Sequence, residues 1–172
     1  MIILAVDPGT TRSAWLEFDT TAGQPVPGRW DIEPNAALIE SIRGWHDAAR
    51  VGEVPFLDAL VIERVASYGM SVGDEVFETV HWAGRFAEAA FPSTPVYRVP
   101  RKTVTLNLCH SARANDSNVR RALLDRFGGD AAIGRKATPG PLYGLHSHLF
   151  AALAVAVTWA DMSPEDREGA RL

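Results

Sequence analysis

The sequence contains one cysteine, lacks any long apolar run and has no overall excess of basic charge. The sole cysteine, Cys109, excludes an internal disulfide and a zinc site built from cysteines. No uninterrupted apolar stretch approaches the roughly 20 residues that span a bilayer. The opening run Ile2–Val6 is too short for a signal peptide. These absences predict a cytoplasmic protein without a membrane segment.

Charge is distributed unevenly along the chain, although the formal net charge is only −4. Residues 98–136 carry nine basic and three acidic side chains, a net charge of +6, whereas the remainder carries eight basic and 18 acidic side chains, a net charge of −10. Such asymmetry is typical of a one-sided surface that binds phosphates. A solvated helical face would give the same pattern, so charge alone leaves both interpretations open.

The 172 residues predict one domain at 1–162 and a polar tail at 163–172 that frays. Apolar runs predict strands, and apolar residues at helical spacing predict helices. The predicted strands are Ile2–Val6, Ser13–Phe18, Arg29–Ile32, Ala59–Ile62 and Val96–Val99. The predicted helices begin at Pro34, near Ser71, at Asn115 or Asp116 and near Ser147, with a loop at 134–144. This order predicts an α/β fold, a mixed sheet with helices on both faces.

The helix predicted between Val72 and Phe91 has more apolar residues than one buried face requires. Phe77, His81 and Trp82 fall outside the face that faces the core. An apolar surplus of this kind indicates a partner surface. We therefore expect a homodimer that forms through this helix.

Two acidic residues each follow a buried apolar strand. Asp7 ends the first predicted strand and Glu63 ends the fourth. If these strands are parallel neighbours, both carboxylates lie at the carboxyl edge of the sheet, where open α/β sheets bind ligands. Close carboxylates repel each other, and Mg²⁺ or Mn²⁺ would remove that repulsion. Alternatively, the two acids cap turns or pair with Arg12 and Arg64.

Two histidines precede the last predicted helix and are candidates for a further position in this site. His148 falls in the first turn of the helix, and His146 is the rival candidate. A neutral imidazole ligates metal or accepts a proton from water, and a helix N-terminus keeps it neutral. A surface or capping histidine is the alternative interpretation for both.

Several motifs resemble a known family of nucleases. Ile3–Thr11 resembles the first motif of RuvC-type Holliday junction resolvases, Leu60–Val65 resembles the second, and Ala151–Ala156 resembles the last helix. Further segments resemble RuvC-like proteins of phages and prophages, namely Ala66–Met70, Glu75–Thr79, Gly84–Phe86, Arg113–Asp116, Asn118–Gly128 and Thr138–Gly144. Together these motifs cover most of residues 2–160 in the order found in the family.

The resemblance implies a ribonuclease-H-like fold with a mixed five-stranded sheet. It also implies an endodeoxyribonuclease that cleaves Holliday junctions or other branched DNA with two Mg²⁺ or Mn²⁺ ions, in recombination, repair or phage DNA processing. Asp7 and Glu63 match the first two metal ligands of the family and His148 matches the third. Ala151 stands where the family usually has aspartate. Asp116 is a possible alternate residue of this site, although a helix N-cap is its expected role.

The resemblance also suggests which residues contact DNA. Arg101 and Lys102 resemble a basic pair near the site, and Tyr68 follows Glu63 where the family places an aromatic that stacks at the junction centre. Further candidates for phosphate contacts are Arg113, Arg120, Arg121, Arg135 and Lys136. Because a four-way junction is nearly two-fold symmetric, symmetric cleavage again favours a homodimer.

Three other functions remain open at this stage. Because Ala151 replaces an acid, the chain could bind junctions without cleaving them. An RNA-processing nuclease of the same fold is a second alternative. The third is an actin-like or sugar-kinase-like ATP-binding domain, since such domains also open with a strand, an aspartate and a Gly-Thr-Thr turn for phosphate. That class needs a second phosphate loop and a second domain, and we expect neither in this chain.

Overall fold

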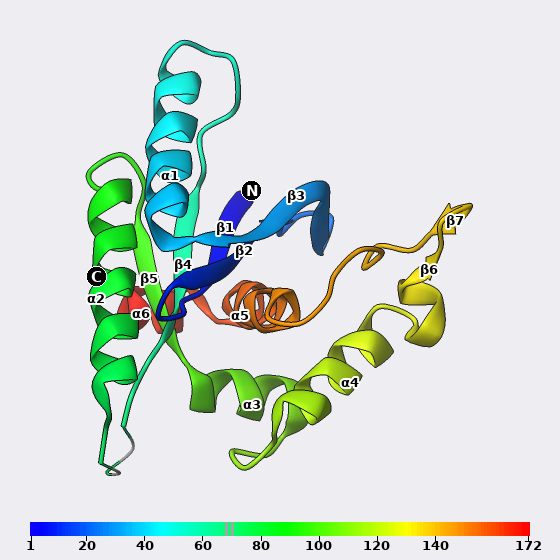
Figure 1. Ribbon diagram of the computed structural model, residues 1–172. Helices are drawn as coiled ribbons and strands as arrows, with labels where there is room; N and C mark the ends of the chain where they lie inside the picture. The colour runs from blue at the N-terminus through cyan, green and yellow to red at the C-terminus, as the bar shows by residue number, and fades with distance from the viewer. Residues whose placement is uncertain (68, 70) are drawn as a thin grey trace.

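A five-stranded mixed sheet lies at the centre of the computed structural model, which describes residues 1–67, 69 and 71–172 (Figure 1). Its strands are β1 Ile2–Asp7, β2 Arg12–Asp19, β3 Gln24–Pro34, β4 Ala59–Arg64 and β5 Val96–Pro100. They follow the order β3-β2-β1-β4-β5. β1 and β3 each pair antiparallel with β2, whereas β4 lies parallel to both β1 and β5. The predicted mixed sheet is therefore confirmed.

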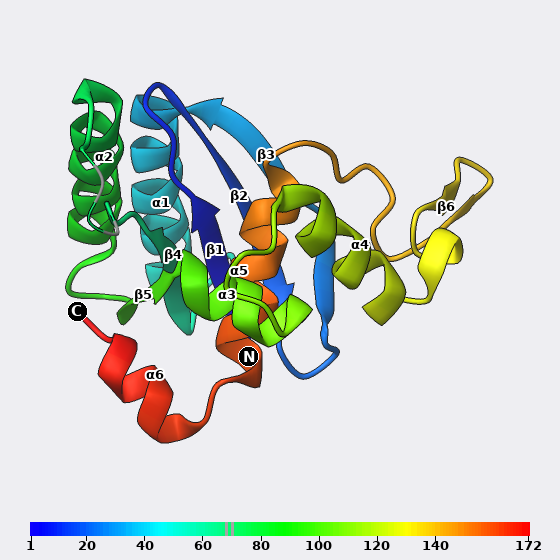
Figure 2. The same cartoon turned by 90° about the horizontal axis from the view of Figure 1, so that it is seen from below.

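Helices cover both faces of this sheet, as predicted (Figures 1 and 2). One face is covered by α1 Asn35–Arg50 and α2 Asp74–Ala90, and the other by α3 Arg101–Cys109, α4 Asp116–Arg126 and α5 Leu149–Asp161. Alternation along β1 explains the two layers, because successive strand residues point to opposite faces. Ile3 and Ala5 pack in the layer of α5, whereas Leu4 and Val6 pack in the layer of α1 and α2.

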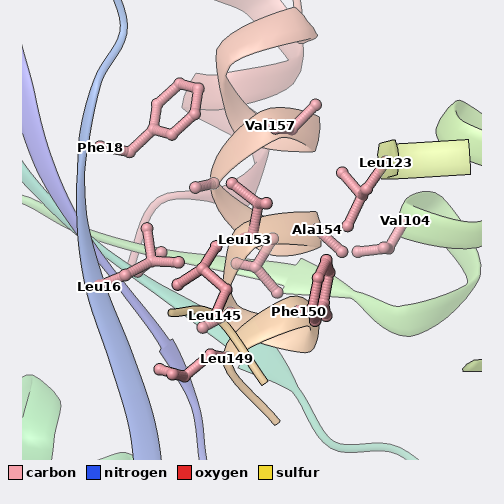
Figure 3. Close-up of a cluster of buried hydrophobic side chains, with 14 of the residues drawn as sticks. Leu16, Phe18, Val104, Leu123, Leu145, Leu149, Phe150, Leu153, Ala154 and Val157 are labelled. Carbon is pink, nitrogen blue, oxygen red and sulfur yellow. The ribbon is translucent and has the colours of Figure 1, made fainter. Parts of the chain in front are cut away.

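Helix α5 lies between the sheet and two other helices. All residues from Leu149 to Trp159 are buried except Ala151. Figure 3 shows the α5 side chains between β2 on one side and α3 and α4 on the other, with labelled neighbours Leu16, Phe18, Val104 and Leu123. A helix that is apolar all round requires such cover. The burial of α5 fixes the position of its first turn relative to the ends of β1 and β4.

The prediction that the C-terminal tail frays is wrong. Residues Pro164–Ala170 form helix α6, which Ser163 caps by accepting a hydrogen bond from the Asp166 amide. The Arg167 guanidinium lies over the Trp159 ring, 4.3 Å from its centroid, and donates to the carbonyls of Trp159 and Ala160. These contacts with α5 hold a segment whose own sequence is polar.

Two further elements differ from the predictions. Helix α3 was not predicted, because only Val104 and Thr105 are buried along its nine residues and it has little apolar periodicity. The expected loop at 134–144 contains a hairpin, β6 Gly134–Arg135 and β7 Thr138–Pro139, which projects away from the sheet (Figure 1). In the part of the chain that the structure describes, no helix has the length and apolar character needed to cross a membrane.

Candidate active site

The carboxylates of Asp7 and Glu63 are brought to one edge of the sheet. Val6 pairs with Ile62 in the parallel ladder between β1 and β4, so Asp7 and Glu63, which follow them, lie at the carboxyl ends of neighbouring strands. Both carboxylates are mostly buried, with side chains 17 % and 12 % exposed respectively. They line a cavity of about 230 Å³ together with Pro8, Arg64 and Arg101. β1 and β4 are thus parallel neighbours, which is the condition under which both carboxylates were expected at one edge of the sheet.

The turn that follows Asp7 is fixed by side-chain hydrogen bonds. The Ser13 hydroxyl accepts from the Gly9 amide (3.1 Å) and donates to Asn35 Oδ1 (2.7 Å), and Asn35 Nδ2 donates to the Gly9 carbonyl (3.0 Å). Ser13 and Asn35 are fully buried. A Cβ atom at Gly9 would lie 2.2 Å from the Arg12 carbonyl oxygen, so the turn admits only glycine there. This network was not predicted from the sequence, since it joins residues 22 positions apart.

Burial and neighbouring charges shift the pKa values of the two acids. Burial, reinforced by the charge of Asp7, raises the pKa of Glu63 to about 7, while Arg101 opposes this rise. Burial also raises the pKa of Asp7, which is opposed first by the nearby His148. Two buried acids with raised pKa values form a site that gains from a bound cation. The alternative pairing with Arg12 is not seen, because Arg12 donates to the Ile32 carbonyl.

His148 reaches this site and His146 does not. His148 Nδ1 lies 3.0 Å from Asp7 Oδ2, whereas His146 Nδ1 contacts the Gly144 carbonyl of its own loop at 3.1 Å. When His148 Nδ1 carries the proton and donates to Asp7, Nε2 of the neutral ring keeps a free lone pair. The His148 side chain is 72 % exposed, so this atom is open to a ligand from solvent.

Arg101 links the buried Glu63 to a third acid, Asp116. Its Nε lies 3.7 Å from Glu63 Oε1, and its guanidinium also hydrogen-bonds the Asp116 carboxylate. The expectation that Asp116 acts as a helix N-cap is wrong, because Asn115 caps α4 by a reciprocal pair of hydrogen bonds with Asn118. Asp116 is instead the first residue of α4, and its carboxylate faces Arg101. No sequence pattern indicated this contact, which depends on the unpredicted helix α3.

The donor set fits a hard divalent cation. Carboxylate oxygens suit Mg²⁺ or Mn²⁺, and Mg²⁺ usually keeps several waters rather than filling its shell with protein ligands. Among the described residues, no three His, Cys, Asp or Glu side chains already lie close enough together to cage a metal. Asp7 and Glu63 would therefore hold an ion whose remaining positions are taken by water and phosphate.

The other residues predicted to contact DNA are distributed over four places. Arg101 and Arg120 line a cavity of about 330 Å³ beside His148, and Arg113 and Arg121 line a separate hollow along α4. Lys102 is exposed on α3, and Arg135 and Lys136 are exposed on the projecting hairpin. Tyr68 lies outside the residues that the structure describes.

The comparisons with known proteins identify the fold. The chain has a RuvC fold, which is ribonuclease-H-like: it superposes on Thermus thermophilus RuvC with a TM-score of 0.61 at 20 % identity, covering 99 % of this chain and 98 % of that one. It also superposes on T. thermophilus RuvC in complex with a Holliday junction substrate, with a TM-score of 0.63 at 22 % identity and the same coverage. At this identity the likeness shows the fold alone.

No family model matches the sequence. One curated protein, a type III pantothenate kinase of Herminiimonas arsenicoxydans, is 30 % identical over 95 residues. That match covers 55 % of this chain and 34 % of the kinase, so it spans about a third of the relative's length.

Proposed function

We propose that the protein is a divalent-metal-dependent endonuclease that cleaves Holliday junctions or other branched DNA in the cytoplasm. The observation that carries this proposal is the pair Asp7 and Glu63 at neighbouring strand ends, with His148 hydrogen-bonded to Asp7. The RuvC fold and the net +6 segment, of which Arg101 and Arg120 lie beside His148, support the same conclusion. The neighbour solved with a Holliday junction makes branched DNA the first substrate to test.

In the proposed reaction, water attacks a phosphodiester and the bond from phosphorus to the 3′-oxygen breaks. Asp7 and Glu63 would hold Mg²⁺ or Mn²⁺, two ions per site in this proposal. When bound, the ions would lower the pKa of the water and offset charge on the leaving oxygen. His148 accepts the water proton at Nε2, because its Nδ1 is turned toward Asp7. The Arg101 guanidinium, 26 % exposed beside Glu63, binds a phosphate oxygen of the substrate.

A homodimer would provide the two active sites that symmetric cleavage of a junction requires. Helix α2 is the proposed interface, because it leaves large apolar side chains in solvent. Phe77 is 63 % exposed and Val80 49 % exposed, and Phe91 just after the helix is 77 % exposed. Apolar side chains grouped in this way favour contact with a second copy.

The decisive experiment compares cleavage of a labelled four-way junction with a matched linear duplex and an RNA hairpin, in Mg²⁺ or Mn²⁺. The wild type is expected to nick the junction in paired, symmetric positions. Asp7→Asn and Glu63→Gln are expected to lose cleavage and keep junction binding. Retained cleavage by either variant would overturn the assignment of the site. Preference for the RNA hairpin would favour an RNA-processing nuclease, and junction binding without cleavage by the wild type would identify a catalytically inactive binder.

The match with a pantothenate kinase favours a second candidate, an ATP-binding function. In that case the turn after Asp7, held by Ser13 and Asn35, would bind nucleotide phosphates. A rise in melting temperature with ATP and Mg²⁺, combined with absence of junction binding, would support this candidate over the nuclease. A rise with junction DNA and none with ATP would reject it.

A further inference from the structure

On α5, Ala151 stands where the resembled family usually has aspartate, and it faces a cavity. Ala151 lies one turn after His148, and both line the cavity of about 330 Å³ beside the site. Ala151 is the one residue between Leu149 and Trp159 that is not fully buried, so its methyl group forms part of the cavity wall. A longer side chain at this position would extend into the space rather than into the core.

A carboxylate enters the same cavity from the opposite element. Asp116, on the first turn of α4, lines it together with Ser117 and Arg120. Its side chain is 94 % exposed, and it has no part in the capping box that Asn115 and Asn118 form. Its hydrogen-bond partner is Arg101, the residue that also contacts Glu63. The Arg101 side chain thus links Asp116 to Glu63.

We propose that Asp116 supplies to this site the carboxylate that α5 lacks at Ala151, so that the third acid of the metal site comes from α4. The inference rests on the proposed metal-dependent function. It gives the site three acids on three different elements, β1, β4 and α4, with His148 at the start of α5. Arg101 would then exchange its contact with Asp116 for a substrate phosphate.

The test is a titration with MnCl₂ alone, following unbound Mn²⁺ by its electron paramagnetic resonance signal. The variants are Asp7→Asn, Asp116→Asn, Ala151→Asp and the double variant Asp116→Asn/Ala151→Asp. Asp125→Asn is the matched control, because Asp125 is also an exposed, arginine-paired acid on α4. Asp116 is almost fully exposed, so its replacement does not threaten folding.

Asp116→Asn is expected to weaken Mn²⁺ binding by about tenfold or more, since loss of even an outer-shell partner of a metal ligand lowers affinity about 10–100-fold. The double variant is expected to recover most of this loss by restoring an acid on α5, and Asp125→Asn is expected to match the wild type. Binding by Asp116→Asn equal to wild type would overturn the inference. If Asp7→Asn still loses binding in that case, the proposed metal site stands without Asp116; if the wild type binds no Mn²⁺, both proposals fail.

Discussion

His148 Nδ1 lies 3.0 Å from Asp7 Oδ2, which joins the start of α5 to the end of β1 across 141 positions of sequence. The contact is possible because α5 is clamped between the sheet and α4, so its first turn has one position. His146, two residues earlier, faces its own loop instead, because Ser147 between them has a left-handed backbone with φ of 46°. The two histidines are therefore a matched pair for experiments.

His148→Ala is expected to lower junction cleavage by about 10²–10⁴-fold, the usual contribution of a general base. His146→Ala is expected to leave the rate close to wild type, since its ring does not reach Asp7. Single-turnover cleavage with saturating enzyme is the measurement, because it separates chemistry from binding. Equal losses in the two variants would contradict the role given to His148.

Metal-free protein is expected to lose stability between about pH 5 and pH 8 because of Glu63. Its pKa rises from 4.5 in the unfolded chain to about 7 in the folded protein, so the folded state keeps a proton that the unfolded state has released. The stabilisation is therefore present at low pH and lost as the pH rises through 7. It amounts to up to about 3 kcal/mol at about 1.4 kcal/mol per pKa unit.

The measurement is urea unfolding with a chelator at several pH values, for wild type and Glu63→Gln. The free energy of unfolding of the wild type minus that of the variant should fall as the pH rises. Taking the difference removes the titration of His46, whose pKa is lowered by burial. A difference that stays flat would show that Glu63 titrates normally.

The projecting hairpin is expected to contribute phosphate contacts. Arg135→Ala/Lys136→Ala should weaken junction binding and reduce the slope of log affinity against log salt by about 0.9 for each lost phosphate contact. Arg43→Ala/Arg50→Ala on α1 is the control, because these cations lie outside the basic segment. Equal slopes for the hairpin variant and wild type would remove the hairpin from the DNA surface.

Phe77→Glu is expected to make the protein monomeric at micromolar concentration without changing its fold. The side chain is 63 % exposed on α2, so the charge affects association rather than the core. Phe56→Glu, at a residue 53 % exposed outside α2, is the control that should leave the dimer intact. Light scattering measures the mass, and a wild type that is already monomeric would contradict the proposed interface.

The elements that depend on local sequence patterns could be predicted from the sequence. The fully apolar runs that end in Asp7 and Glu63 indicated buried, usually parallel strands, and the structure supplied the pairing that places both residues at one sheet edge. Helix α3 could not be predicted in this way, since its contacts come from tertiary packing of Val104 and Thr105. The same holds for the choice between His146 and His148, which depends on one residue, Ser147, with positive φ. Asp116 was placed at the right helix end but given the wrong partner.

The polar segment after α5 has a consequence for association that differs from the α2 surface. The Leu172 amide donates to the Val96 carbonyl at 2.9 Å, and Arg171 bridges to Tyr97, so this segment lies against the outer edge of β5. An open strand edge is a template for pairing with another chain. The last ten residues thus cover part of the β5 edge and hinder the pairing of another strand with it. A chain shortened to residue 162 should form sheet-mediated aggregates that Phe77→Glu does not suppress, detectable as thioflavin-positive material.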